Sequence, residues 1–483
     1  MIFRLAHAFS WELGGRLLLT AIGVVVSILL ARMLSPEDFG EMAVVTVTIV
    51  LAKMLIDVGL GSALIQRRKL HPAYADSVFA LNLFAGVVLA LTVYFAAPAI
   101  AGFYEIPRLQ ALLRVVGGVF VLYAFAGVQM TLLRRDLRFD LLAKVSVTSA
   151  LGSAVVAVSF ALSGAGVWSL EAQAVAQAFF TAAGTWMVSR WRPAGLVSLK
   201  ALRRLWAFGF RVFLTSVLEN VFSRLDTLII ARLFPVATLG YYNRARNLDQ
   251  LIIGYSSGAL MSVLFPFFSR HQHSGERFVQ MVRKGYAILL FAVFFLLGGF
   301  FVVAQEFVPA LLGDQWIPAA QFFRILLLSS YAYPLSALLL NVLISRGRSR
   351  RLLRVELYRK GIFSVNLLFG FAGGVEGYLY GLAAVSFVNV SLAMRCAARE
   401  LGIGFSAFFL PFVSQAVVTA VTVAATFIVV SYTGFEGVWE TLLYKGILFA
   451  VLYLLIGYIA DTAATHVTVS EMGRLIGRKK GKI

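Results

Sequence analysis

Long apolar runs recur along the whole chain, separated by short polar gaps, and they restrict the fold more than any other feature. About twenty apolar residues in a helix are enough to cross the hydrocarbon core of a bilayer. Of the 483 residues, 60% are hydrophobic and 14% are charged, which is too little polar surface for a soluble chain of this length. The runs are continuous rather than alternating, so strands of a membrane barrel are not expected. We therefore predict an all-α polytopic membrane protein.

We assign fourteen membrane-spanning helices to these runs, an even number that places both chain ends on one side of the membrane. The predicted spans are residues 12–33, 40–64, 77–99, 111–133, 145–163, 167–189, 207–233, 239–268, 286–305, 320–345, 355–372, 375–394, 409–431 and 441–460.

The cations of the chain predict its orientation. The net charge is +20, and Lys and Arg gather in the gaps that follow even-numbered spans, as in residues 346–360. The opposite gaps contain turn sequences such as residues 163–166 and 373–377. Because cation-rich gaps remain in the cytoplasm, we predict that the N and C termini are both cytoplasmic. This distribution accounts for the basic balance, and we expect no binding to nucleic acid.

The chain partly repeats itself at an offset of 200 residues. Residues 29–34, with Gly40 after them, resemble residues 229–234, with Gly240 after them. Transporters commonly use such repeats to build a cavity between two lobes. We predict two pseudo-symmetric six-helix lobes plus two extra helices. The predicted segments are an N-lobe at 1–190, a cytoplasmic connector at 191–206, a C-lobe at 207–399, two additional spans at 400–462 and a basic cytoplasmic tail at 463–483.

Polar and ionisable side chains concentrate in spans one, two, seven and eight. An ionisable group at the bilayer centre costs about 2.5 kcal/mol or more, so it usually faces a cavity or a partner. If the repeat relates the lobes, these four spans meet at a central, partly cationic cavity. Arg favours an anionic substrate there, because its planar fork binds phosphate or carboxylate and keeps its charge when desolvated. The candidate substrate-binding residues are Arg16, Arg211, Arg224, Asn243, Arg246, Asn247 and Gln250.

A second set of charged residues in the same spans provides candidates for ion coupling. Lys53 and Asp57 are four residues apart, a spacing that predicts an ion pair on one helix face, and Glu12 and Arg16 have the same spacing. The alternative interpretation is that such charges neutralise one another and hold the lobes together. The candidate ion-coupling residues are Lys53, Asp57, Glu219 and Asp226.

The sequence contains no motif for catalysis or for a bound cofactor. It has no nucleotide-binding loop of the Gly-x4-Gly-Lys-Ser/Thr type, and the extracytoplasmic gaps are too short to hold an active site. His271 and His273 could contact a metal, but no acidic cluster accompanies them, and a solvated loop is the simpler interpretation. We therefore predict a protein that is not an enzyme and that has no metal site and no cofactor.

Several stretches, in a fixed order along the chain, carry a family resemblance. The chain resembles the polysaccharide flippases, the Wzx-type transporters of the MOP superfamily, and within them the branch of the colanic-acid and succinoglycan exporters. The joint match is specific, whereas any one stretch alone is weak. The stretches are residues 30–40 with 57–66, residues 132–139, residues 225–231, and residues 311–316 with 324–326.

The resemblance implies a MOP/MATE-like fold, alternating access and a substrate of undecaprenyl-diphosphate-linked oligosaccharide. Members of the family flip this substrate from the cytoplasmic to the outer leaflet of the bacterial cytoplasmic (inner) membrane for exopolysaccharide, O-antigen or capsule synthesis. The implied partners are this lipid-linked oligosaccharide, the lipid bilayer and the polysaccharide polymerase or chain-length machinery. Coupling to a proton or sodium gradient also occurs in the superfamily.

Four alternatives remain open. A lipid II flippase and a multidrug/proton antiporter belong to the same superfamily, although a drug-cation antiporter should favour acidic residues in its cavity. A polysaccharide polymerase would need a long periplasmic loop, which is missing. A membrane scaffold for a synthase complex would not account for Arg residues within the spans.

Overall fold

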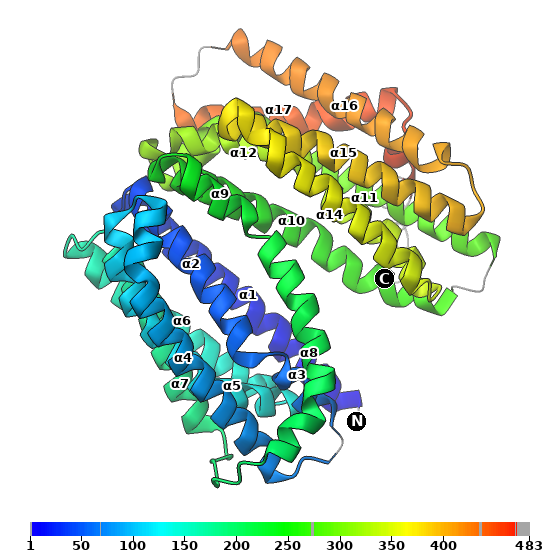
Figure 1. The fold of residues 1–483 in the computed structure, drawn as a ribbon. Coiled ribbons are helices and arrows are strands. Elements are labelled where there is room, and N and C mark those ends of the chain that lie inside the picture. Colours follow the sequence, from blue (N-terminus) through cyan, green and yellow to red (C-terminus); the bar gives the residue numbers. More distant parts are fainter. Residues whose placement is uncertain (1, 68, 272–274, 434–436, 469, 471–483) are drawn as a thin grey trace. The chain divides into compact units, whose positions relative to one another are not determined.

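The computed structural model describes residues 2–67, 69–271, 275–433, 437–468 and 470. Within these ranges all regular secondary structure is helical, and each of the fourteen predicted spans corresponds to one helix or to two consecutive helices. The all-α polytopic prediction is therefore confirmed. Contacts divide the chain into two compact units, Met1–Asn243 and Arg244–Ile483, and each unit is described by itself (Figure 1).

The described helices have the length and composition of membrane spans. In the described ranges, eleven helical segments are long and apolar enough to cross a bilayer, and three of them, Leu199–Leu233, Asp314–Ser345 and Arg350–Leu401, each include two α-helices. Helix Trp168–Val188 also matches a predicted span but does not pass this apolarity criterion, because Glu171, Gln173 and Gln177 lower its mean hydropathy. The chain is thus a multi-pass membrane protein.

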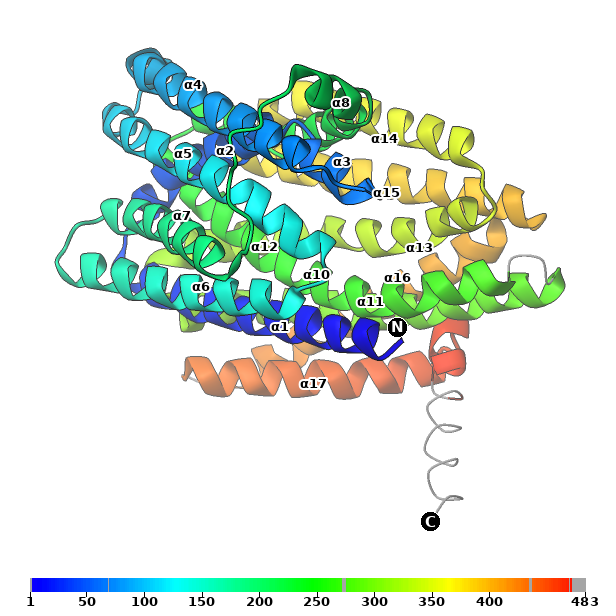
Figure 2. The same cartoon turned by 90° about the horizontal axis from the view of Figure 1, so that it is seen from below.

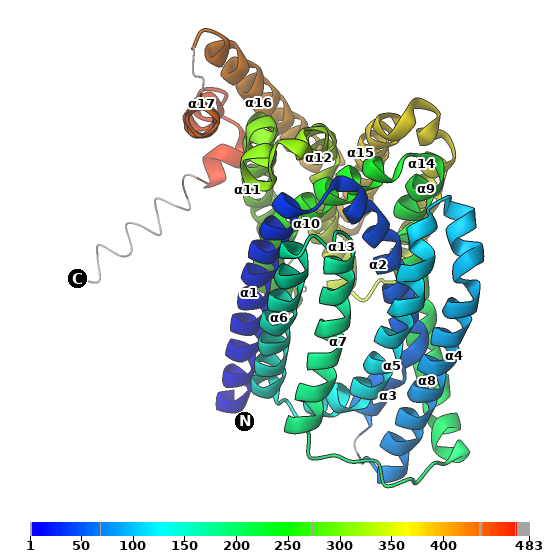
Figure 3. The same cartoon turned by 90° about the vertical axis from the view of Figure 1, so that its left-hand side faces the viewer.

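Unit 1 is a bundle of helices that pack side by side. Helix α1 lies along α6, α6 lies along α7, and α5 packs against both α7 and α4 (Figure 3). The unit also includes the first two turns of α10 (Val236–His271). Its other helices are α1 (Ile2–Met33), α2 (Pro36–Asp57), α3 (Leu60–Gln66), α4 (Pro72–Tyr104), α5 (Pro107–Arg135), α6 (Phe139–Leu162), α7 (Trp168–Val188), α8 (Leu199–Phe222) and α9 (Leu225–Leu233).

Local sequence explains where α2 begins. Ser35 is its N-cap residue and its hydroxyl accepts a hydrogen bond from the backbone N–H of Asp38, while the Asp38 carboxylate accepts one from the backbone N–H of Ser35. Pro36 occupies the first turn, where its missing N–H costs nothing. This capping box fixes the start of α2, and with it the position of every polar residue farther along the helix.

Helix α8 belongs to unit 1 and packs against α3 and α4 (Figure 2). Leu205 of α8 joins a buried apolar cluster with Leu60 and Leu64 of α3 and with Val78 of α4. The loop before α8 is also fixed, because the Asp76 carboxylate accepts hydrogen bonds from the backbone N–H groups of Ala194 and Leu196 at 3.0 and 2.9 Å. The connector predicted at 191–206 is therefore docked on α4 rather than extended into solvent, and its second half is helical.

Unit 2 is organised around α11, which contacts α12, α13, α16 and α17. Helix α15 contacts α12, α13 and α14. A buried ion pair links α11 to α17, with Lys445 Nζ 2.6 Å from Glu306 Oε1. The helices of this unit are α11 (Glu276–Leu312), η1 (Asp314–Trp316), α12 (Ile317–Ser330), α13 (Ala332–Ser345), α14 (Ser349–Phe369), η2 (Gly370–Gly373), α15 (Gly374–Leu401), α16 (Ser406–Ser431) and α17 (Val438–Ile459).

The boundary between the two units lies in α10, after Asn243. Contacts group α8, α9 and the start of α10 with the N-terminal helices. The division of the sequence into six, six and two spans remains a prediction. Most of the predicted basic tail, residues 471–483 together with residue 469, lies outside the described residues.

Candidate functional site

The second predicted span is interrupted directly after Asp57. Val58 and Gly59 both have a left-handed backbone, with φ of 45° and 71°, and α3 starts at Leu60. The Asp57 carboxylate turns back into this break, where Oδ1 accepts a hydrogen bond from the backbone N–H of Gly61 at 3.1 Å. A Cβ atom on Gly59 would overlap the carbonyl oxygen of Gly209 in α8, so the break requires glycine for contact as well as for backbone conformation.

Lys53 and Asp57 do not pair with each other among the described residues, so the predicted ion pair is wrong. Lys53 Nζ lies 3.6 Å from the centre of the Tyr123 ring, a cation–π contact with α5. Asp57 instead binds the backbone of the break. A spacing of four residues permits a pair, but a ring on one side and free N–H groups on the other offered each charge a nearer partner.

The seventh predicted span is interrupted as well, at Ser223 and Arg224 between α8 and α9. Asp226 in the first turn of α9 is buried, and its carboxylate accepts hydrogen bonds from the hydroxyl of Tyr242 in α10 and from the backbone N–H of Thr227. Arg224, half-buried beside the break, forms no hydrogen bond or ion pair through its side chain within the described part of the chain. Two neighbouring charged residues therefore differ: hydrogen bonds hold the Asp226 carboxylate, whereas the role of Arg224 in substrate binding remains a prediction.

Three further predicted residues of unit 1, Arg16, Arg211 and Glu219, lie exposed on their helices. Glu219 and Arg16 have no side-chain partner in the ranges that the structure describes, and Glu12 and Arg16 do not form the pair that their spacing permits. Arg211 Nε donates a hydrogen bond to the carbonyl oxygen of Ala207 in its own helix at 2.8 Å. No described hydrogen bond or ion pair joins two of the predicted residues of this unit.

The polar stripe on α10 crosses the boundary between the units. Asn243 is the last residue of unit 1, whereas Arg246, Asn247 and Gln250 belong to unit 2. Asn247 and Gln250 are exposed, and Asn243 and Arg246 are half-buried. These residues remain predictions for substrate binding.

Two charged residues that flank this stripe have clear partners inside unit 2. Asp249 is buried and accepts a hydrogen bond from the hydroxyl of Ser330 in α12. The Arg244 guanidinium lies over the ring of Trp316, 5.8 Å from its centre. Asp249 and Arg244 therefore attach α10 to α12 and η1.

The two copies of the sequence repeat contact each other where α2 and α10 begin. A Cβ atom on Gly40 would overlap the backbone carbonyl of Val236, and a Cβ atom on Gly240 would overlap that of Pro36. The contact is thus reciprocal at the same offset of 200 residues that relates the two sequence copies. Only glycine allows the two helix starts to approach this closely.

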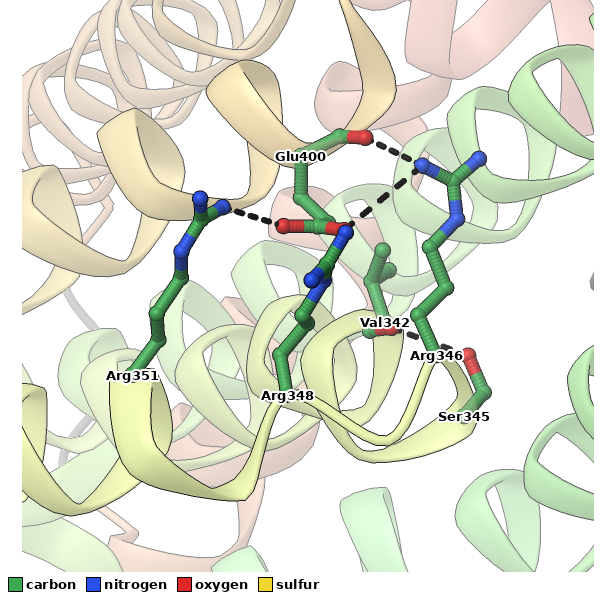
Figure 4. A network of polar contacts seen from close by, with 6 residues as sticks. All are labelled: Val342, Ser345, Arg346, Arg348, Arg351 and Glu400. Carbon is green, nitrogen blue, oxygen red and sulfur yellow. Dashed lines mark hydrogen bonds and ion pairs between the residues drawn. The ribbon is translucent and has the colours of Figure 1, made fainter.

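Sequence reasoning missed a network at the turn between α13 and α14 (Figure 4). Glu400, near the end of α15, is buried, and its carboxylate contacts three arginines. Arg351 Nη1 lies 2.6 Å from Oε2 and Arg348 Nε lies 3.2 Å from Oε1, while Arg346 also donates to the backbone carbonyl of Glu400. The residues are about fifty positions apart, so no local spacing could have identified the pairing.

The described residues contain no group of three His, Cys, Asp or Glu side chains that could hold a metal ion. Of the two histidines considered above, His271 ends α10 and His273 lies outside the described residues. The absence of a cofactor and of a metal remains a prediction.

Helices long enough to cross a bilayer define a multi-pass membrane protein, and two of its predicted spans are interrupted at polar positions. The model of the family described as polysaccharide biosynthesis protein matches residues 29–321, and the chain belongs to this family. The resemblance seen in the sequence is therefore confirmed at the level of the family.

Individual proteins agree with this assignment. The teichuronic acid biosynthesis protein TuaB of Bacillus subtilis is 25% identical over 427 residues, which are 85% of this chain and 86% of the relative. The succinoglycan biosynthesis transport protein ExoT of Rhizobium meliloti is 30% identical over 301 residues, 62% of this chain and 61% of the relative. The solved structure of the lipid II flippase MurJ, in an inward closed conformation, matches with a TM-score of 0.71 at 12% identity, covering 95% of this chain and 98% of that one. The last match shows a shared fold.

Proposed function

We propose that this chain flips undecaprenyl-diphosphate-linked oligosaccharide repeat units from the cytoplasmic to the outer leaflet of the bacterial cytoplasmic membrane. The units would serve exopolysaccharide, O-antigen or capsule assembly, and transport would proceed by alternating access. Membership of a polysaccharide biosynthesis family supports this proposal, as does a relative named as a succinoglycan transport protein. The chain would act as a transporter rather than an enzyme, with both termini in the cytoplasm, and would deliver its product to polymerase and chain-length proteins.

The observation that carries the proposal is that the Arg224 guanidinium has no partner among the described residues. A half-buried guanidinium beside a helix break, without a carboxylate or hydrogen-bond partner in the described part of the chain, is costly to maintain in a membrane protein. A diphosphate would satisfy it, because phosphate oxygens accept two parallel hydrogen bonds from one guanidinium. Asp57, Glu219, Asp226 and Lys53 remain candidates for coupling this movement to an ion gradient.

The test is export of polysaccharide by Arg224→Ala and Arg246→Ala variants in a strain that lacks the native protein. Loss of a charge-assisted contact of about 1.5–3 kcal/mol should lower the export rate by about tenfold or more. Lipid-linked repeat units should then accumulate in the cytoplasmic leaflet, while the variant remains in the membrane. The matched control is Arg203→Ala, which removes an exposed cation from α8, the helix that precedes the break. This variant should export normally. Normal export by both test variants would remove these residues from the mechanism.

The same variants separate the proposal from its alternatives. A multidrug/proton antiporter should gain or keep activity toward organic cations when Arg224 is neutralised, because a cationic residue repels such substrates. A lipid II flippase should restore growth of cells depleted of their own lipid II flippase. Drug resistance or growth rescue without polysaccharide export would contradict the proposed substrate.

A further inference from the structure

A groove in unit 2 lies between α13, α14 and α15, next to the Glu400 network. Its volume is about 530 Å³, and we name it the arginine groove after Arg351, Arg354 and Arg399, which line it. Apolar side chains line it as well, among them Leu343 and Val355. The arginine groove thus combines cationic and apolar surface at the end of a helix bundle.

Helical spacing explains why three cations meet here. Arg351, Arg354 and Tyr358 are three and four residues apart on α14, so they share one helix face. Cys396 and Arg399 are three residues apart on α15 and line the opposite side. The face that α14 turns toward α15 is therefore cationic at its first two turns.

The cations of the groove are only partly neutralised. Glu400 binds Arg351, and it also binds Arg346 and Arg348 (Figure 4). Arg354 and Arg399 have no carboxylate or hydrogen-bond partner among the described residues. The single carboxylate is already shared by three guanidinium groups, so the groove retains an excess of positive charge.

This excess is suited to a phosphate. Two guanidinium groups on facing helices can bind the oxygens of one phosphate with charge-assisted hydrogen bonds. The groove also offers apolar contact, because Leu343, Val355 and Leu392 line it, and Leu357, three residues after Arg354 on α14, is 60% exposed. A phosphate that carries acyl chains would use both surfaces, whereas free phosphate would use only the first. Basic recesses between membrane helices recognise lipid head groups in this way.

We propose that the arginine groove binds the phosphate-bearing head group of an anionic membrane lipid. The proposal does not depend on which substrate the protein transports. It assigns Arg354 and Arg399 to the phosphate, and it assigns Arg351 to holding the groove together through Glu400.

The chain contains a natural reporter for occupancy of this groove. Cys396 is its only cysteine, lines the groove and is half-exposed. Purified full-length protein is placed in nanodiscs of phosphatidylcholine, with or without phosphatidylglycerol, and the rate of Cys396 modification by N-ethylmaleimide is measured. A head group that occupies four-fifths of the grooves should slow modification by about fivefold in the discs that contain phosphatidylglycerol.

Two variants test whether the arginines cause this protection. In the double variant Arg354→Gln/Arg399→Gln the rates in the two kinds of disc should become equal, whereas Arg350→Gln, an exposed cation outside the groove lining, should retain the protection. A separate Arg350→Cys variant in a Cys396→Ser background reports the general effect of a negative surface on thiol reactivity. Equal slowing at position 350, or full protection in the double variant, would overturn the proposal.

A last experiment distinguishes a lipid head group from free phosphate as the ligand of the groove. Inorganic phosphate is added to phosphatidylcholine discs at the concentration that matches the phosphatidylglycerol head groups. We expect no protection from it, because the apolar lining of Leu343, Val355 and Leu392 would remain unused. Protection by inorganic phosphate equal to that by phosphatidylglycerol would overturn the assignment to a lipid. If the double variant does not purify as a single species, Arg354→Lys/Arg399→Lys replaces it, and loss of the bidentate geometry should still raise the rate.

Discussion

At the residue scale, Asp226 shows how a membrane span accommodates a buried carboxylate. Its oxygens accept hydrogen bonds from the hydroxyl of Tyr242 and the backbone N–H of Thr227. These hydrogen bonds within unit 1 offset the free-energy cost of burying the carboxylate. Glu219, seven residues earlier, is exposed and has no such partner in the described ranges. The sequence predicted both Glu219 and Asp226 as candidates for ion coupling. It could not show that only Asp226 is held by hydrogen bonds, because Tyr242 lies sixteen residues away on another helix.

This contrast predicts different effects on stability. Asp226→Ala removes the carboxylate that accepts hydrogen bonds from the Tyr242 hydroxyl and the Thr227 backbone, and loss of a buried hydrogen bond to a charged group costs about 1.5–3 kcal/mol. We expect a clear drop in the midpoint of thermal unfolding of the detergent-purified protein. Glu219→Ala is the matched control, and its midpoint should be unchanged. Equal midpoints for the two variants would show that the hydrogen bond from Tyr242 contributes nothing to stability.

Glu400 offers a second test at this scale. Its side chain is 5% exposed and faces three arginines that are 27–56% exposed, so solvent screens part of the attraction. Glu400→Ala should lower the free energy of unfolding by about 1–2 kcal/mol, a value discounted for this exposure. Glu356→Ala removes a single, more exposed partner of Arg359 and should cost about 0–1 kcal/mol. Unfolding in detergent by heat, followed by tryptophan fluorescence, compares the two, and the reverse order would contradict the network in Figure 4.

At the scale of elements, spans could be predicted from the sequence more reliably than their interruptions. Apolar length alone gives the spans, because the bilayer fixes it. The break after Asp57 has a local signal in Gly59, whose left-handed backbone favours glycine. The break at Ser223 and Arg224 has neither glycine nor proline, so neither local sequence nor periodicity could reveal it.

The glycine contact between α2 and α10 gives a prediction for these elements. Gly240→Ala places a methyl group on the carbonyl of Pro36, so the two helix starts must separate. Such overpacking typically destabilises by about 1–3 kcal/mol. Gly23→Ala in α1, where nothing lies within 4 Å of the new Cβ, should instead be neutral or stabilising by about 0.4–1 kcal/mol. Unfolding midpoints of the two variants measure the difference, and a Gly240→Ala protein as stable as the Gly23→Ala protein would exclude the close approach.

At the scale of the whole molecule, the family and the all-α multi-pass fold follow from features that are distributed over the chain. The apolar runs and the ordered motifs each use many residues, so single exceptions such as the polar helix α10 do not obscure them. A binding residue depends instead on which helices face one another, and side chains distant in sequence decide that. For this reason the fold was predictable, whereas the Glu400 network and the hydrogen bond of Asp226 were not.

Orientation in the membrane is the remaining property of the whole molecule that the cations predict, and single cysteines can test it. In a Cys396→Ser background, Arg350→Cys adds a thiol at the cation-rich end of α14, and Ser163→Cys adds one in the turn after α6. Both positions are exposed, so accessibility within the protein does not distinguish them. Because Lys and Arg remain on the cytoplasmic side, an impermeant thiol reagent applied to intact cells should label position 163 and leave position 350 unlabelled. Disruption of the cells should make position 350 reactive, which shows that its thiol is intact. Labelling of position 350 in intact cells, with protection of position 163, would reverse the orientation and would place the arginine groove in the outer leaflet.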